Sequence, residues 1–198
     1  MGLNLEYING QTPLNEDEKD GLLIPAIAIR SELDEFEQQN IEEAIQWILT
    51  RSLRPETIFS EKFILNLHKR MYGNVWAWAG KFRRTNKNLG IDKFKIPIAL
   101  KILLEDATYW VENSTYTPDE IAIRFKHRLV SIHCFANGNG RHSRLMADLI
   151  VDKIFKKPMF SWGTNNLVKQ NDSRTNYIKA VKEADSNNYL PLLAFARS

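Results

Sequence analysis

The chain has 198 residues, 43% hydrophobic and 26% charged, which is typical of one globular domain. Its formal net charge of +3 is too small to indicate nucleic-acid binding, and its single cysteine, Cys134, excludes an internal disulfide framework and suits a reducing compartment. With no secretory signal pattern and no apolar run near the ~20 residues of a membrane span, we expect a cytoplasmic protein without a membrane or direct nucleic-acid partner.

The first half of the chain is predicted to be helical from the spacing of its apolar residues. Residues 31–50 repeat them at intervals of three and four, and Ser31, followed by acidic residues, is a suitable N-cap. A second helix is expected from Ser60, and it ends at Gly73.

Residues 80–97 interrupt this pattern. Glycines, asparagines and a proline remove any 3.6-residue period, while residues 89–91 and 94–96 suit two short paired strands. We interpret the segment as a small β-hairpin or flap. The alternative is a solvated basic loop, which the composition alone favours.

The second half returns to helical spacing from about Pro97. A further helix starts at Thr117-Pro118, where threonine caps and proline takes the first helical position, and it runs to Ile132. Helical patterns follow over residues 141–156, 177–184 and 190–196. These elements predict an all-α single domain with a short β-hairpin flap, in which an N-terminal arm and helix (1–58) pack on a core (59–198).

The segment HCFANGNGRHSR, residues 133–144, separates two of the predicted helices. The first N–H groups of a helix lack intrahelical partners and carry partial positive charge, and flanking glycines let several of them converge on one point. Gly138-Asn139-Gly140 therefore predicts an anion cradle. Arg141 and Arg144, three positions apart, suit a bound polyphosphate.

His133 lies just ahead of this cradle. A histidine at a helix end is more often structural, but beside a phosphate cradle it is suited to take a proton from an attacking hydroxyl. The residues therefore predict transfer of a phosphate-containing group. The chain has neither a GxxxxGK[ST] phosphate loop nor a protein-kinase HRD or DFG motif.

These residues resemble the Fic/Doc signature HPFx[DE]GNGRxxR. The positions in register are His133, Phe135, Gly138, Asn139, Gly140, Arg141 and Arg144. The segments TPLNEDEKDGLL, WAWAGKFR and PMFSWG make the wider chain similar to the subgroup called mobile mystery protein B. The GNGR form resembles the AMP-transferring members rather than Doc, and the resemblance implies one helical Fic domain with residues 59–198 as its core.

The resemblance implies a protein nucleotidyltransferase that moves AMP from ATP to a Ser, Thr or Tyr hydroxyl of a target protein. His133 would be the general base, and Phe135 a buried anchor of the loop. Backbone N–H groups of residues 138–140 would form the anion hole, with a phosphate contact from the Asn139 side chain. Arg141 would bind near the β-phosphate and Arg144 the γ-phosphate.

Two positions depart from the signature. Cys134 replaces a proline, and we expect an inert, partly buried thiol there. Asn137 replaces the acid that would ligate Mg²⁺, and its neutral amide oxygen is a weaker ligand for a hard cation. We therefore expect Mg²⁺ to be held weakly, with the nucleotide phosphates supplying much of the charge.

Weaker resemblances extend to three further groups of residues. The flap would dock the target as an added strand through Lys87, Asn88, Leu89, Gly90 and Ile91. Trp162, Asn165 and Tyr177 would line the base pocket, although core or surface roles are equally good interpretations. Ser31 and Glu35 match part of an inhibitory motif whose glutamate pairs with the second arginine, Arg144; the alternative is a capped, acidic first turn.

The leading hypothesis is thus an ATP-dependent protein AMP transferase, the toxin-like member of a pair with a small antitoxin or regulator protein. The alternative is a catalytically weakened nucleotide-binding protein that regulates its partner by interaction. Asn137 supports this alternative, because it replaces the acid that would ligate Mg²⁺. A phosphotransferase or an AMP-removing enzyme has less support.

Overall fold

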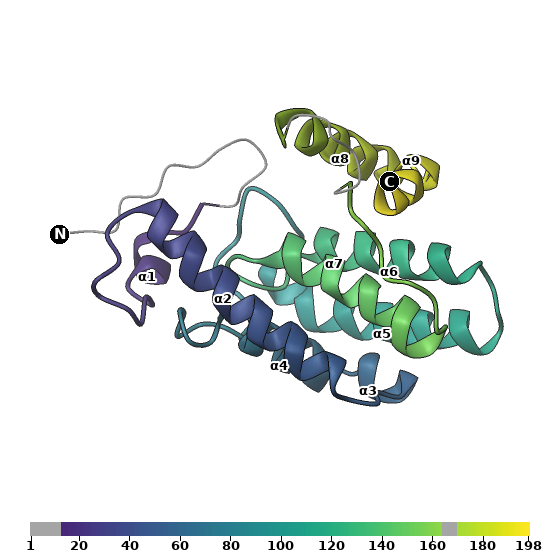
Figure 1. The fold of residues 1–198 in the computed structure, drawn as a ribbon, viewed down its shortest axis with the longest axis horizontal. Coiled ribbons are helices and arrows are strands. Elements are labelled where there is room, and N and C mark those ends of the chain that lie inside the picture. The colour runs from purple at the N-terminus through teal and green to yellow at the C-terminus, as the bar shows by residue number, and fades with distance from the viewer. Residues whose placement is uncertain (1–12, 164–169) are drawn as a thin grey trace.

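Helices form almost all of the regular structure in the computed structural model, which describes residues 13–163 and 170–198 (Figure 1). In chain order they are α1 (Glu16–Lys19), α2 (Arg30–Leu49), α3 (Pro55–Ile58), α4 (Glu61–Tyr72), the 3₁₀ turn η1 (Lys93–Lys95), α5 (Ile96–Glu112), α6 (Pro118–Ile132), α7 (Asn139–Leu149), the π-helical turn η2 (Ile150–Ile154), α8 (Gln170–Asp185) and α9 (Leu190–Arg197). The helical fold expected from the sequence is confirmed.

The central helices begin where their capping residues predict. The Ser60 hydroxyl accepts a hydrogen bond from the N–H of Phe63 at 3.2 Å, and α4 follows it. The Thr117 hydroxyl accepts one from Glu120 N–H at 3.4 Å, and Pro118 opens α6. Each cap satisfies an N–H group that the first turn of a helix cannot bond internally.

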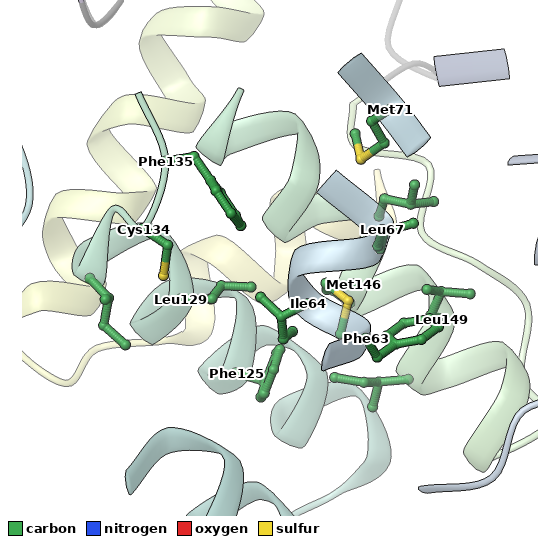
Figure 2. Close-up of a cluster of buried hydrophobic side chains, with 14 of the residues drawn as sticks. Phe63, Ile64, Leu67, Met71, Phe125, Leu129, Cys134, Phe135, Met146 and Leu149 are labelled. Carbon is green, nitrogen blue, oxygen red and sulfur yellow. The ribbon is translucent and has the colours of Figure 1, made fainter. Parts of the chain in front are cut away.

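Helices α4, α6 and α7 meet in the hydrophobic core shown in Figure 2. Phe63, Ile64 and Leu67 of α4 lie among side chains of α6 and α7. Phe135, from the connection between α6 and α7, is fully buried in the same cluster. The loop that carries the signature is therefore held by the core on one side.

The remaining helices cover this centre from two sides. Helix α2 lies along α4, where the Asn40 side chain donates to the carbonyl of Arg70 at 2.9 Å and accepts from the N–H of Asn74 at 3.0 Å. Helices α8 and α9 lie together beside α6 and α7 (Figure 1). Arg197 of α9 forms a two-point ion pair with Asp119 of α6 at 2.7 and 2.8 Å.

Two helix boundaries differ from the sequence prediction. Helix α2 starts at Arg30, with Ile29 as its N-cap. The Glu32 carboxylate in the first turn accepts hydrogen bonds from the N–H groups of Ala28 and Ile29 and so fixes this start. Ser31 therefore lies inside α2 and is exposed rather than capping it. The helix after the signature starts at Asn139 and continues beyond Leu149 as the π-helical turn.

The β-hairpin flap predicted within residues 80–97, from strands at 89–91 and 94–96, is not formed. In the described chain the isolated bridge between Leu22 and Trp76 is the only β pairing. The guanidinium of Arg83 bonds the carbonyls of Thr85 and Ile91, and Asn86 accepts from Lys93 N–H at 2.8 Å. Arg83 thus occupies the Ile91 carbonyl of the first predicted strand, and the second predicted strand is instead the 3₁₀ turn η1 and the start of α5. In the described ranges no helix has the length and apolar character to cross a membrane.

Candidate active site

The signature residues form a tight connection between α6 and α7. His133 ends α6 in the left-handed conformation (φ 58°, ψ 62°), and Gly138 precedes α7 with φ 78°. Gly138 has no side chain that could cap the helix, so the first N–H groups of α7 keep their anion-binding character. The predicted bend at residues 138–140, followed by the N-terminus of a helix, is confirmed.

The Asn139 side chain forms hydrogen bonds across this loop. Its amide oxygen accepts from the N–H of Phe135 at 2.9 Å, and its amide nitrogen donates to the Phe135 carbonyl at 2.8 Å. The side chain is 5% exposed. We expected this side chain to contact phosphate, but both of its polar atoms hold the loop in shape. The backbone N–H of Asn139 remains the candidate phosphate donor.

The two glycines of the loop differ in the space around them. A Cβ on Gly138 would lie 2.6 Å from ring atoms of Tyr72, and its positive φ also disfavours a side chain. A Cβ on Gly140 would meet no atom within 4 Å. Tyr72 thus packs closely against Gly138, whereas the space that a Gly140 side chain would occupy, on the first turn of α7, is open.

His133 is buried, and its environment favours the neutral imidazole. Burial, followed by the positive charge of Arg83, lowers its pKa to about 4, while a hydrogen bond with the Val130 carbonyl opposes this. A neutral imidazole has one N–H. If that N–H is donated to Val130, the other ring nitrogen keeps its lone pair and can accept a proton.

The two arginines have different neighbours. A terminal nitrogen of Arg141 lies 2.6 Å from Oε2 of Glu37 on α2. The other carboxylate oxygen of Glu37 accepts from the indole N–H of Trp76 at 2.7 Å. This glutamate is 3% exposed, so Arg141 is paired with a buried carboxylate on a separate helix.

The inhibitory contact expected between Glu35 and Arg144 is not formed. Glu35 is exposed. The buried face of α2 is instead made by Leu33, Glu37, Asn40, Ile41, Ala44 and Ile48. Two residues turn a helix by about 200°, so Glu35 and Glu37 point in opposite directions. The acidic side chain that reaches the signature is Glu37, and it reaches Arg141.

Arg144 lies beside the residues expected at the base pocket. Its guanidinium carbon is 5.5 Å from the ring centroid of Tyr177 on α8. One turn further along α7, the Asp148 carboxylate accepts from the indole N–H of Trp162 at 3.0 and 3.1 Å. The structure thus brings Trp162 and Tyr177 to the same helix as Arg144. Asn165 lies outside the described residues.

Asn137 fits a metal site poorly. Its side-chain oxygen accepts from the N–H of Gly138 at 2.6 Å, and this atom is the one that would ligate Mg²⁺. The described ranges contain no group of three His, Cys, Asp or Glu residues able to hold a metal ion. The described side chains therefore do not build a Mg²⁺ site of their own.

Cys134 is fully buried next to His133 in the chain. Burial raises the pKa of its thiol to about 12, so the thiolate is absent at neutral pH. Its carbonyl accepts from the N–H of Arg83 at 2.9 Å. The role of this residue is packing and backbone pairing.

The segment expected to dock the target lies against His133. A Cβ on Gly90 would overlap the Cβ of His133, and the N–H of Ile91 approaches the Ile132 carbonyl at 3.5 Å. Asn88 and Leu89 are exposed next to them. Lys87 differs, because its ammonium pairs with Glu18 and is largely buried. The segment holds exposed side chains beside His133, but Lys87 is a structural anchor.

Four buried polar residues near the signature were not singled out in the sequence: Glu37, His68, Arg83 and Lys126. Arg83, 5% exposed, donates to the His133 carbonyl at 2.7 Å. Lys126 on α6 is fully buried, with its ammonium 4.6 Å from the Tyr177 ring centroid. The sequence signal for Glu37, His68 and Lys126 was a charged or titratable residue on the apolar face of a predicted helix. Arg83 lies near the start of the segment interpreted as a flap and carried no such signal.

Known proteins similar to this chain point to one family. A family model described as the Fic/DOC family matches residues 58–151. The chain is 30% identical over 138 residues to "Protein adenylyltransferase Fic" of Drosophila grimshawi, covering 68% of this chain and 27% of that protein. The protein of the same name from Aedes aegypti is 25% identical over 159 residues, covering 78% and 30%. The chain thus spans little more than a quarter of the length of these relatives.

Solved structures share the fold. Fic-1 from C. elegans superimposes with a TM-score of 0.68 at 24% identity, over 90% of this chain and 51% of that one. BepC, a VirB-translocated effector from Bartonella tribocorum with bound AMPPNP, gives 0.68 at 16% identity, over 92% and 97%. The signature loop lies within the matched residues, and the chain carries a domain of the Fic/DOC family at residues 58–151.

Proposed function

We propose that the protein is an adenylyltransferase that moves AMP from ATP to a Ser, Thr or Tyr hydroxyl of a target protein. The observation that carries the proposal is the neutral, buried imidazole of His133 directly ahead of the uncapped N-terminus of α7, with open space above Gly140. The curated relatives named as adenylyltransferases agree with it.

In the proposed reaction the α-phosphate of ATP lies at the N-terminus of α7. Backbone N–H groups of Asn139 and Gly140 and the helix dipole stabilise the charge that develops on its oxygens. His133 takes the proton of the target hydroxyl as the oxygen attacks the α-phosphorus. A P–O bond forms to the target, the bond to the β-phosphate oxygen breaks, and pyrophosphate leaves.

The remaining expected site residues take supporting roles in this proposal. Arg144 binds the γ-phosphate, and Tyr177 and Trp162 border the nucleobase. Arg141 binds near the β-phosphate once it leaves Glu37. Residues 88–91 contact the target next to His133. No step is assigned to a metal ion, and any Mg²⁺ that accompanies ATP is expected to be held mainly by its phosphates.

Labelled ATP tests the proposal. Purified protein is incubated with a lysate and ATP labelled at either the α- or the γ-phosphate, beside His133→Ala as the control. We expect α-label in protein with the wild type, a loss of roughly 10²-fold or more in the variant, and the same γ-label with both proteins, which is the background of the lysate's own kinases. More γ-label with the wild type than with His133→Ala would instead indicate a phosphotransferase.

A second candidate function is nucleotide-dependent regulation without transfer. It is favoured by the hydrogen bond between the Asn137 side chain and Gly138 N–H, which occupies one donor of the anion hole. This alternative predicts ATP binding by calorimetry together with no transfer of either label. A pairing with a small antitoxin, and membership of the mobile mystery protein B subgroup, would suit either function.

A further inference from the structure

His68 lies on α4 and is fully buried beneath the signature loop. Its ring stacks on Phe135, with centroids 3.6 Å apart and planes inclined by 18°. One ring nitrogen, Nε2, lies 3.0 Å from the carbonyl oxygen of Asn137. A histidine on the scaffold helix therefore contacts the loop through both its ring face and its ring edge.

The second ring nitrogen shows which tautomer is present. The N–H of Gly80 donates to Nδ1 of His68 at 3.0 Å, so Nδ1 must carry a lone pair. Burial, with the nearby His142, lowers the pKa of His68 well below its usual value, so the ring is neutral. Its one proton is then on Nε2, which donates to the Asn137 carbonyl.

Gly80 makes this arrangement specific. It has φ 74°, and a Cβ there would lie 2.6 Å from the Cβ of Lys69 and 2.8 Å from the Leu65 carbonyl. The chain can therefore approach α4 closely enough for its N–H to reach His68 only because this residue is glycine. The WAWAGKFR segment thereby sets the tautomer of a ring that bonds the signature loop.

The bond to Asn137 acts on the proposed anion hole. Asn137 directly precedes Gly138, and the peptide that joins them carries both the bonded carbonyl and the N–H of Gly138. Because a peptide unit is planar, holding its carbonyl toward α4 also fixes the direction of that N–H, which donates to the Asn137 side chain at 2.6 Å. It also fixes the position from which the first turn of α7 starts.

We propose that His68 is a positioning residue for AMP transfer: as the neutral Nε2–H tautomer, set by Gly80, it holds the Asn137 carbonyl and so fixes the start of α7, whose Asn139 and Gly140 N–H groups face the transferred phosphate. This role rests on the proposed function. It requires the donor on Nε2, whereas a packing role alone requires only a ring-sized side chain.

Two substitutions separate the donor from the packing. His68→Asn keeps an acceptor near the Nδ1 position but cannot reach Asn137, whereas His68→Gln places an amide donor near the Nε2 position. Both remove the ring stacked on Phe135. We expect kcat to fall by about tenfold or more in His68→Asn, with a small change in KM for ATP, and to recover substantially in His68→Gln.

His142 provides the matched control. It is also buried and neutral, and its ring centroid lies 5.6 Å from that of His68 and 5.2 Å from that of Phe135. Its Nε2 lies 3.1 Å from the carbonyl of Ile64 within α4 and not from the loop. His142→Gln should lower the melting temperature as the His68 variants do while leaving kcat near the wild-type value.

Measurements without catalysis complete the test. In the wild type, ¹⁵N NMR should show His68 with a slowly exchanging Nε2–H and an unprotonated Nδ1. Amide exchange at residues 138–140 should be faster in His68→Asn than in His68→Gln or His142→Gln. A protonated Nδ1 on His68, or equal exchange and equal kcat loss in all three variants, would overturn the proposal. Absence of α-phosphate transfer by the wild type would contradict the proposed function, and the NMR data would still decide the role of His68.

Discussion

The signature loop (residues 133–140) and the flanking segment (residues 84–92) are both irregular, rich in glycine and asparagine, and placed side by side, yet they are held differently. The loop bonds inward, through Asn139 to Phe135 and through His68 to Asn137, and its polar groups are buried. The segment is held by the buried side chains of Arg83 and Lys87, while Asn88 and Leu89 remain exposed.

This difference indicates a division of labour. Unmade hydrogen bonds cost most where water cannot replace them, so the loop has one well-defined shape. The exposed segment can exchange protein bonds for water or for a partner at small cost. A rigid phosphate cradle beside an adaptable surface suits an enzyme that binds one nucleotide and docks a separate protein.

Acidification should give the largest loss of stability, because it protonates the buried histidines in and around the signature loop. Burial lowers the pKa of His133 to about 4 and that of His142 to about 3. The unfolded chain therefore binds more protons below about pH 6.5, and the free energy of unfolding falls as the pH falls toward these values. From pH 7 to pH 5 the loss is about 2 kcal/mol for each of the two histidines.

The pKa values of His68 and His127 are also lowered, by burial first, so these residues act in the same direction. Thermal melts at several pH values measure the sum. A melting temperature that stays constant between pH 7 and pH 5 would contradict the buried, neutral state of these rings.

Substituting the two loop glycines should separate fold from ligand binding. Gly138→Ala places a methyl group against Tyr72 at positive φ, and we expect a loss of about 3 kcal/mol in unfolding free energy together with loss of transfer. Gly140→Ala meets no protein atom, so its stability should match the wild type, while its methyl enters the open space proposed for phosphate and weakens nucleotide binding. Denaturant unfolding and ATP titration measure both, and equal effects of the two substitutions would be inconsistent with this assignment.

In the flanking segment, Arg83→Met should make residues 84–92 more mobile. The carbonyls of Thr85, Ile91 and His133 lose their charged donor, and an unsatisfied buried acceptor costs about 1–3 kcal/mol. We expect a loss of about 2 kcal/mol, faster proteolysis within residues 84–92 and lower transfer. Lys81→Met is the control, because Lys81 is exposed and two residues away. Proteolysis at the same rate in both variants would show that Arg83 does not anchor the segment.

A smaller effect is expected where α2 meets the signature. Glu37→Gln keeps an acceptor for Trp76 but removes the charge paired with Arg141. Arg141 is then available to nucleotide phosphate, and we expect affinity for ATP to rise by about fivefold, or roughly 1 kcal/mol. Glu35→Gln is the matched control on the exposed face of the same helix. Calorimetry measures both, and identical affinities would mean that the ion pair does not compete with the nucleotide.

Local chemistry in the sequence was enough to predict much of this protein. Thr117-Pro118 and Ser60 mark helix starts through capping, and Gly138 to Gly140 mark a bend and a helix N-terminus, because these signals act within a few residues. The positions of His133, Arg141 and Arg144 around that bend follow from helical periodicity alone. These features carried the family resemblance and the reaction class.

Contacts between distant segments were decided only by the tertiary structure. Which of Glu35 and Glu37 faces the signature depends on how α2 is rotated against α4, and both choices satisfy the same local pattern. Whether residues 84–92 form a hairpin depends on Arg83, whose guanidinium competes with strand pairing for the same carbonyls. The bond from His68 to Asn137 joins residues 69 positions apart. Such contacts depend on packing and on competition for hydrogen bonds, and neither can be read from a short window of residues.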